Sequence, residues 1–113
     1  MKIYLHILIL GFLCMACTEE TVEPKAAEIL RRSRTHLQEG RYDAARDSVL
    51  SMRKQYPTAL ESRAQGILLL DSIEMFAAQD SMDGATGEDW KRLSIKAQFF
   101  ERKLQEDKKK LGK

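Results

Sequence analysis

The chemically reactive side chains of this 113-residue sequence are few and do not form a catalytic pattern. Of its two histidines only His36 lies beyond the apolar start of the chain, and a lone histidine on a helix is most often an ordinary surface or boundary residue. The HExxH, GxSxG, phosphate-loop and dinucleotide-binding motifs do not occur. We therefore expect a protein that is not an enzyme and that uses no cofactor, metal ion or small-molecule substrate.

Four carboxylates between residues 80 and 89 are of the type that binds calcium: Asp80, Asp83, Glu88 and Asp89. They lack the one-three-five oxygen spacing and the closing glutamate of an EF-hand, so we interpret them as part of a solvated loop. The other carboxylates lie on helices rich in lysine and arginine, where exposed ion pairs contribute little to stability.

Two thiols lie near the start of the chain, at Cys14 and Cys17. A positively charged start is followed by an apolar run from Ile3 to Leu13 and by small residues up to Ala16. This run is shorter than the roughly 20 residues that span a bilayer, and the order of segments is typical of a secretory signal peptide.

Cys17 directly follows Ala16, and the composition then changes to Thr18-Glu19-Glu20. This arrangement resembles the signal of bacterial lipoproteins, in which the cysteine becomes the first residue of the mature chain and carries acyl chains. The resemblance implies that residues 1–16 are removed together with Cys14, and that Cys17 attaches the protein to a membrane. The alternatives are an ordinary signal peptide with an incidental cysteine, or a short core helix.

The segment after the cysteine, residues 17–23, is acidic and is expected to be a tether. Its glutamates, Glu19, Glu20 and Glu23, resemble the acidic export signal of Bacteroidota lipoproteins. The resemblance implies a lipoprotein of the bacterial cell envelope, held in the outer membrane. Surface-exposed and periplasm-facing orientations both stay open, because acidic residues also make an ordinary solvated tether.

A helical domain is expected over residues 24–111, because every strong hydrophobic period there is helical and none alternates as in a strand. The sequence therefore predicts an all-α fold. Its expected elements are helices from Pro24 to Gln38, Tyr42 to Gln55 and Thr58 to Gln79, a loop from Asp80 to Gly87, and a last helix that begins at a Thr86/Asp89 cap pair and frays from Lys108.

The second half of this domain, residues 58–111, is expected to form a long antiparallel helical hairpin. Its first helix is predicted to present one broad apolar face, made by Leu60, Ala64, Ile67, Leu68, Ile73, Phe76 and Ala77. The last helix repeats apolar residues at spacings of three and four, which predicts a coiled-coil-like seam of Trp90, Leu93, Ala97, Phe100 and Leu104, widened by Ile95 and Phe99. Helical spacing favours a core role over a binding surface for Trp90, Phe99 and Phe100.

Gly40, Tyr42, Ala45 and Pro57 have the spacing found in the second half of a tetratricopeptide repeat, and residues 26–59 resemble one such unit. The resemblance implies that the glycine permits the turn and the tyrosine wedges the helix pair. It also implies that the alanine lets the two helices approach and that the proline ends the unit. A generic αα-hairpin is the alternative.

Net charge is only +2, with 19 Lys+Arg against 17 Asp+Glu, so a general attraction to nucleic acid is excluded. The lysines at the carboxy end favour a solvated helix end, with contact to anionic lipid or another polyanion as the alternative. We predict a membrane-anchored, non-catalytic protein–protein interaction module. Its candidate contact residues are Arg34 and Leu37, which the resemblance places on a concave side, and Trp90, Phe99 and Phe100. A self-associating structural envelope protein is the alternative, and an unrecognised enzyme is a remote one.

Overall fold

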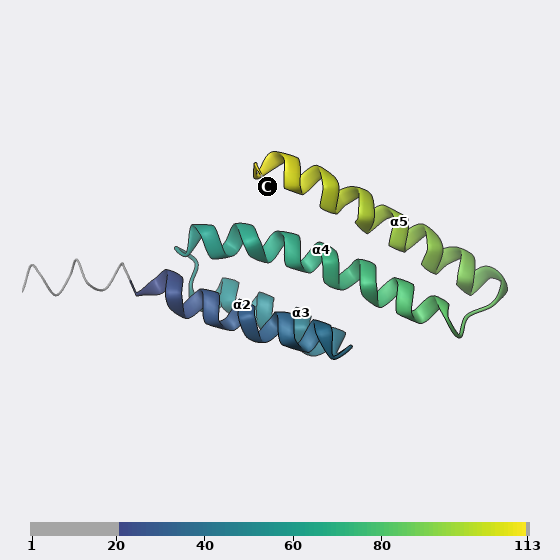
Figure 1. The fold of residues 1–113 in the computed structure, drawn as a ribbon, viewed down its shortest axis with the longest axis horizontal. Helices are drawn as coiled ribbons and strands as arrows, with labels where there is room; N and C mark the ends of the chain where they lie inside the picture. Colours follow the sequence, from purple (N-terminus) through teal and green to yellow (C-terminus); the bar gives the residue numbers. More distant parts are fainter. Residues whose placement is uncertain (1–20, 113) are drawn as a thin grey trace, which may run out of the picture.

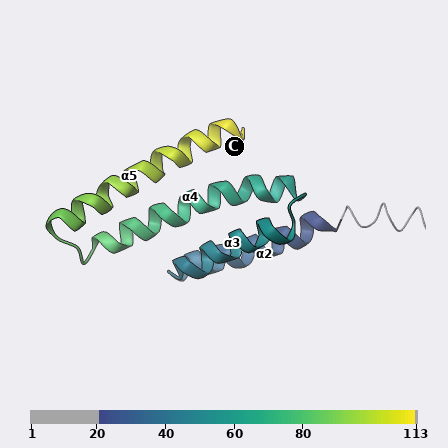
Figure 2. The same ribbon diagram turned by 180° about the vertical axis from the view of Figure 1, so that it is seen from behind.

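The computed structural model of the protein describes residues 21–112, which form four α-helices and, within that range, no β-strand. The helices are α2 (Val22–Gln38), α3 (Tyr42–Gln55), α4 (Leu60–Met82) and α5 (Gly87–Lys110). α4 runs through the middle, with α2 and α3 on one side of it and α5 on the other (Figure 1 and Figure 2). The predicted all-α class is confirmed. The proposed signal peptide, Cys17, Glu19 and Glu20 lie outside the described residues.

The helix bounds agree with the sequence-based expectation most closely where strong turn residues flank a helix. α3 has the predicted bounds, whereas α2 begins two residues early and takes Val22 and Glu23 from the expected tether. α4 continues to Met82 because Ala78 is buried and Met82 half-buried, so the expected loop shrinks to residues 83–86. α5 stays helical to Lys110, and Thr86 makes no side-chain cap bond within the described residues.

Two short turns fix the α2–α3 pair and its connection to α4. Gly40 has φ +74°, a left-handed conformation that glycine adopts without steric cost, and the amide of Arg41 donates to the carbonyl of His36 at 2.8 Å. α3 ends at Gln55, two residues before Pro57, which has no amide hydrogen to donate to a continuing helix. α4 then starts at Leu60. Because the chain reverses direction at each of the two turns, α2 and α4 run in the same direction (Figure 1).

The main core lies where α2, α3 and α4 meet. Its fully buried apolar side chains are Ala26, Leu30, Ala45, Val49, Met52, Ala59 and Ile73. The buried Ser33 hydroxyl donates to the Ala45 carbonyl at 2.7 Å, so two small residues sit at the α2–α3 contact. A Cβ on Gly66 would lie 3.1 Å from Met52 Cε and 3.2 Å from Val49 Cγ1, so α4 approaches α3 closely there.

The central position of α4 explains why its apolar residues do not form the single face that we expected. Leu69 and Ile73 pack into the core with α2 and α3, while Asp71 and Ala78 are buried on the opposite side, toward α5. A helix with neighbouring helices on two sides must bury apolar residues on both of its faces. The prediction that Leu60 and Phe76 belong to a buried face is wrong, because Leu60 is 72% exposed and Phe76 is also exposed.

Among the described helices, α5 packs against α4 alone. Ala97 and Leu104 are buried in this contact, and Leu93 and Phe100 are half-buried. The core role expected for Trp90 and Phe99 is wrong, because they are 47% and 54% exposed. Ile95 and Phe99 do not widen the buried seam. Each lies two residues from Ala97, about 200° around an α-helix, and so faces away from α4.

Candidate functional site

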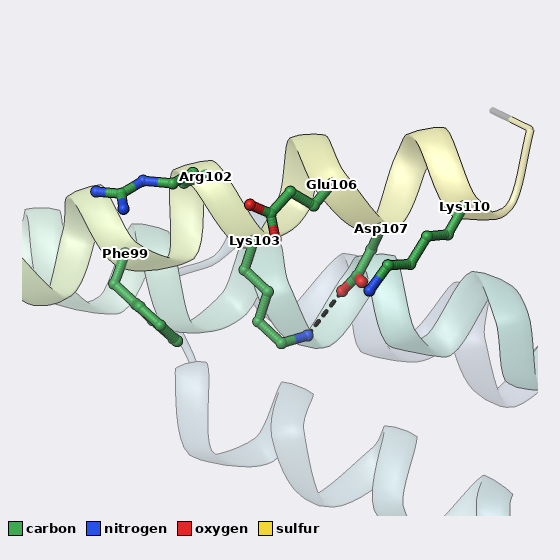
Figure 3. Close-up of a pocket in the computed structure, with 6 residues that line it drawn as sticks. All are labelled: Phe99, Arg102, Lys103, Glu106, Asp107 and Lys110. Carbon is green, nitrogen blue, oxygen red and sulfur yellow. Dashed lines mark hydrogen bonds and ion pairs between the residues drawn. The ribbon is translucent and has the colours of Figure 1, made fainter.

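A cluster of three charged residues joins α4 to α5. Lys103 Nζ lies 2.9 Å from Asp71 Oδ1 and 2.7 Å from Asp107 Oδ2, and the second of these bonds is drawn in Figure 3. Lys103 and Asp107 are four residues apart on α5 and therefore lie on the same face of the helix. Asp71 interrupts the apolar run of α4 and points at α5 with its side chain only 3% exposed.

The electrostatics of this cluster are set by the burial of Asp71. Burial, and then the neighbouring Asp107 carboxyl group, raise the pKa of Asp71, while Lys103 lowers it. The neighbouring Asp71 and Lys103 side chains lower the pKa of Asp107, and the two carboxylates raise the pKa of Lys103. Asp71 Oδ2 is buried without a hydrogen-bond partner among residues 21–112. The cluster therefore acts as an ionic clamp between the two helices that depends on Lys103.

A shallow pocket of about 280 Å³ lies on α5 beside the clamp. Figure 3 shows Phe99 and Lys103 pointing to one side of the helix, with Arg102 and Glu106 on another. The walls combine one aromatic ring with charges of both signs: Phe99, Arg102, Lys103, Glu106, Asp107 and Lys110. Such a surface suits contact with a polar protein segment that also carries an apolar side chain.

A second ionic group links three helices. Glu74 of α4 accepts a hydrogen bond from Arg46 of α3, and its other oxygen lies 3.6 Å from Lys96 Nζ of α5. Arg46 also pairs with Asp43 one turn earlier at 2.8 Å. The Glu74 carboxylate thus holds the guanidinium of α3 and the ammonium of α5 on one edge of α4.

The second pocket, about 450 Å³, lies where α2 begins and α3 ends. Pro24, Ile29 and Tyr56 give it apolar walls, and Lys25 and Arg32 contribute two cations. At the same end, Glu23 accepts hydrogen bonds from the amides of Glu61 and Ser62, both at 3.1 Å, and from the Ser62 hydroxyl at 2.7 Å. A side chain of α2 thereby caps the first turn of α4.

The candidate contact residues do not form one site. Arg34 is exposed and Leu37 half-buried on α2, whereas Trp90, Phe99 and Phe100 lie on α5, across α4. The Phe99 and Phe100 rings pack edge to face with centroids 5.1 Å apart, so the half-buried Phe100 supports the exposed Phe99.

The acidic residues around the α4–α5 turn are also spread out. Asp80 lies in α4 beside Tyr42, and burial together with this carboxylate raises the pKa of the tyrosine. Within residues 21–112 no group of three or more His, Cys, Asp or Glu residues could hold a metal ion. In the same range, no helix combines the length and apolarity needed to cross a membrane.

Sequence reasoning missed the clamp, the Glu74 group and the Glu23 cap. Asp71 carried a signal, because a carboxylate that directly follows the apolar run Ile67–Leu70 is expected to have a partner if the run is buried. Finding that partner requires knowing which part of α5 lies opposite α4. The Glu23 cap joins residues 38 positions apart and leaves no local pattern.

No protein family, curated protein or solved structure matches the chain. A function must therefore be inferred from the chain's own residues.

Proposed function

We propose that the protein is a lipoprotein of the bacterial cell envelope whose helical domain binds another protein and performs no catalysis. Cys17, after a positively charged start, a short apolar run and Ala16, would carry the acyl chains. Several acyl chains anchor a protein far more firmly than a single one. Residues 17–21 would then tether the domain to an outer membrane, in either orientation across it.

The observation that carries a binding role is the outward face of α5. Ile95 and Phe99 lie four residues apart and are 60% and 54% exposed, so they form an apolar pair on the side away from α4. Arg92 lies three residues before this pair on α5, and Arg102 lies three residues after it. Aromatic residues and arginines of this kind supply a large share of the energy at protein interfaces.

The α2–α3 pair supports the same proposal as a scaffold resembling one tetratricopeptide unit. Three of the signature positions support this resemblance: Gly40 has a positive φ in the turn, Ala45 is fully buried at the helix contact, and Pro57 lies between α3 and α4. Arg34 is exposed on α2, where the family has its concave docking side. We assign the outward face of α5 as the main contact surface, because Arg34 on α2 lies across α4 from the exposed apolar residues Ile95 and Phe99.

Self-association through the predicted seam is less favoured. Ala97 and Leu104 of that seam are buried against α4, so the same face pairs with a second copy only if α5 leaves α4. A self-associating protein would instead use exposed apolar residues such as Ile95 and Phe99. Crosslinking at these positions distinguishes a second copy of the chain from another protein by the mass of the adduct.

Photocrosslinking in the native envelope tests the binding role. A photoreactive amino acid at position 95 or 99 should give the same protein adduct, and one at the exposed Gln105 of the same helix should not. Ile95→Glu should abolish the adduct formed from position 99. An adduct of twice the chain's mass would show self-association, and equal adducts at Gln105 would refute a specific face.

The lipid anchor is tested separately with a matched pair of thiol variants. Cys17→Ser should abolish palmitate labelling and release the protein from the membrane fraction. Cys14→Ser should leave both unchanged, because Cys14 leaves with the signal peptide. Unchanged labelling in Cys17→Ser would contradict the lipoprotein assignment.

A further inference from the structure

We infer that the end of the helical bundle next to Cys17 lies directly on an anionic phospholipid surface, with the opposite end pointing away from it. This inference rests on the proposed lipid anchor. The anchor end is defined here as the first turns of α2 and α4 with the last turns of α3 and α5. The far end is defined as the last turns of α2 and α4 with the first turns of α3 and α5.

The anchor end is a real meeting point of helices. Glu23 in the first turn of α2 caps the first turn of α4, and Pro24 and Gln55 line one pocket, which brings the end of α3 to the start of α2. α5 runs back along α4, since Lys103 pairs with Asp71, and returns toward this end (Figure 1).

The tether leaves the anchor end little freedom to move away. Cys17 precedes Val22, the first residue of α2, by five positions. Even a fully extended chain spans at most about 17 Å over that length. The anchor end therefore stays within about two Debye lengths of the lipid-bearing residue at physiological salt, where each is about 8 Å.

The charges of the two ends differ in sign. The anchor end carries the cations Lys25, Arg53, Lys54, Arg63, Lys108, Lys109 and Lys110 against the carboxylates Glu23, Glu61 and Asp107. The cations remain in excess when Glu19 and Glu20 of the tether are added. Within the described helices, the four turns of the far end hold carboxylates and no lysine or arginine: Asp43, Asp80, Glu88 and Asp89. Anionic lipid attracts the first end and repels the second.

The anchor end also exposes side chains that suit the lipid–water boundary. Leu60 in the first turn of α4 is 72% exposed, and the half-buried Tyr56 lines the pocket beside Lys25. Tyrosines and leucines flanked by cations are typical of surfaces that rest in the headgroup layer. The described helices leave Leu60 exposed, and on a lipid surface this side chain would be covered.

The chain contains a single tryptophan, Trp90, and it lies in the first turn of α5 at the far end. The acylated full-length protein is placed in vesicles of brominated phosphatidylcholine containing phosphatidylglycerol, and quenching of tryptophan fluorescence is measured. Trp90 should not be quenched, because α4 alone separates the two ends by about 34 Å. A Leu60→Trp reporter in a Trp90→Phe background should be quenched. Equal quenching of the two reporters would overturn the orientation.

Matched charge variants test whether the cations of the anchor end hold it on the anionic lipid. Added to the Leu60 reporter, Lys109→Gln with Lys110→Gln should lower the ratio of quenched to unquenched molecules about fivefold per cation, equivalent to about 1 kcal/mol each. Lys91→Gln with Arg92→Gln removes two cations from the other end of the same helix and should leave quenching unchanged. Equal effects of the two pairs, or equal quenching in vesicles lacking phosphatidylglycerol, would overturn the inference.

The two proposals fail differently in this experiment. If mass spectrometry finds no acyl chain on the purified protein, or if it does not float with vesicles, the lipoprotein assignment fails. If the protein is acylated and floats, but Leu60 and Trp90 reporters behave alike, only the inferred orientation fails.

Discussion

The ionic clamp makes a quantitative prediction for Lys103→Met. The substitution keeps the length and apolar character of the side chain but removes the ammonium that satisfies the buried Asp71 carboxylate at 2.9 Å. Removing one partner of a fully buried ion pair costs about 3–5 kcal/mol. Because the Lys103 side chain is 40% exposed, water replaces part of the lost interaction, and we expect about 2 kcal/mol. For a domain of this size that lowers Tm by about 8–16 °C.

The loss should depend on pH with a definite sign. The folded-state pKa of Asp71 is raised, and removal of Lys103 takes away the group that lowers it. A carboxyl group whose folded pKa lies above its unfolded value destabilises the fold at higher pH, and this penalty disappears as pH falls through the raised pKa. The deficit of the Lys103→Met variant relative to wild type should therefore be larger at pH 7 than at pH 5.

Thermal unfolding followed by circular dichroism measures both effects. Lys96→Met is the matched control, because Lys96 is half exposed and lies 3.6 Å from Glu74, a geometry worth less than about 1 kcal/mol. Adding Asp71→Asn to Lys103→Met should restore most of the stability by removing the buried charge. Equal Tm losses in the two lysine variants, or a Lys103→Met deficit independent of pH, would refute the clamp.

Three further substitutions test the packing and the cap by thermal unfolding. Gly66→Ala should destabilise the domain by about 1 kcal/mol, because overpacking against α3 outweighs the gain in helix propensity. Gly84→Ala is the control and should be neutral, because a Cβ there meets nothing within 4 Å. Equal effects of the two substitutions would contradict the close approach of α4 to α3. Glu23→Gln should cost about 1 kcal/mol through the weakened α4 cap, and a comparable loss in the exposed Glu28→Gln would contradict this. Ser33→Ala should also cost about 1 kcal/mol, and an unchanged Tm would show that its buried hydrogen bond contributes nothing.

The parts of the fold that could be predicted from sequence are those that local chemistry determines. The bounds of α3 follow from Gly40 before it and Pro57 after it, because a positive-φ glycine and a proline limit a helix whatever lies around it. The residues Ala97 and Leu104 of the seam were also correctly expected to be buried.

The rest depended on which helix lies beside which. A hydrophobic period shows that a helix is buried on some side, but α4 is buried on two, so residues of both faces were merged into one. Phe99 is exposed because α5, unlike α4, has only one neighbouring helix among those described. α5 therefore buries only the stripe of residues around Ala97. The partners of Asp71 and Glu23 come from other helices and are set by packing rather than by spacing.

The same arrangement predicts that α5 opens before the rest of the domain. The α2–α3–α4 core buries side chains from three helices. The α4–α5 contact buries three apolar side chains, Ala78, Ala97 and Leu104, and relies on the Lys103 clamp. Segments with few buried apolar contacts unfold locally at a lower free energy than the whole domain. Backbone amides in the middle of α5 should therefore exchange with deuterium faster than those of α3. Lys103→Met should accelerate exchange in α5 more than in α3. Equal protection of the two helices in the wild type would mean that the clamp and the seam hold α5 as firmly as the core, and that α5 unfolds only with the domain.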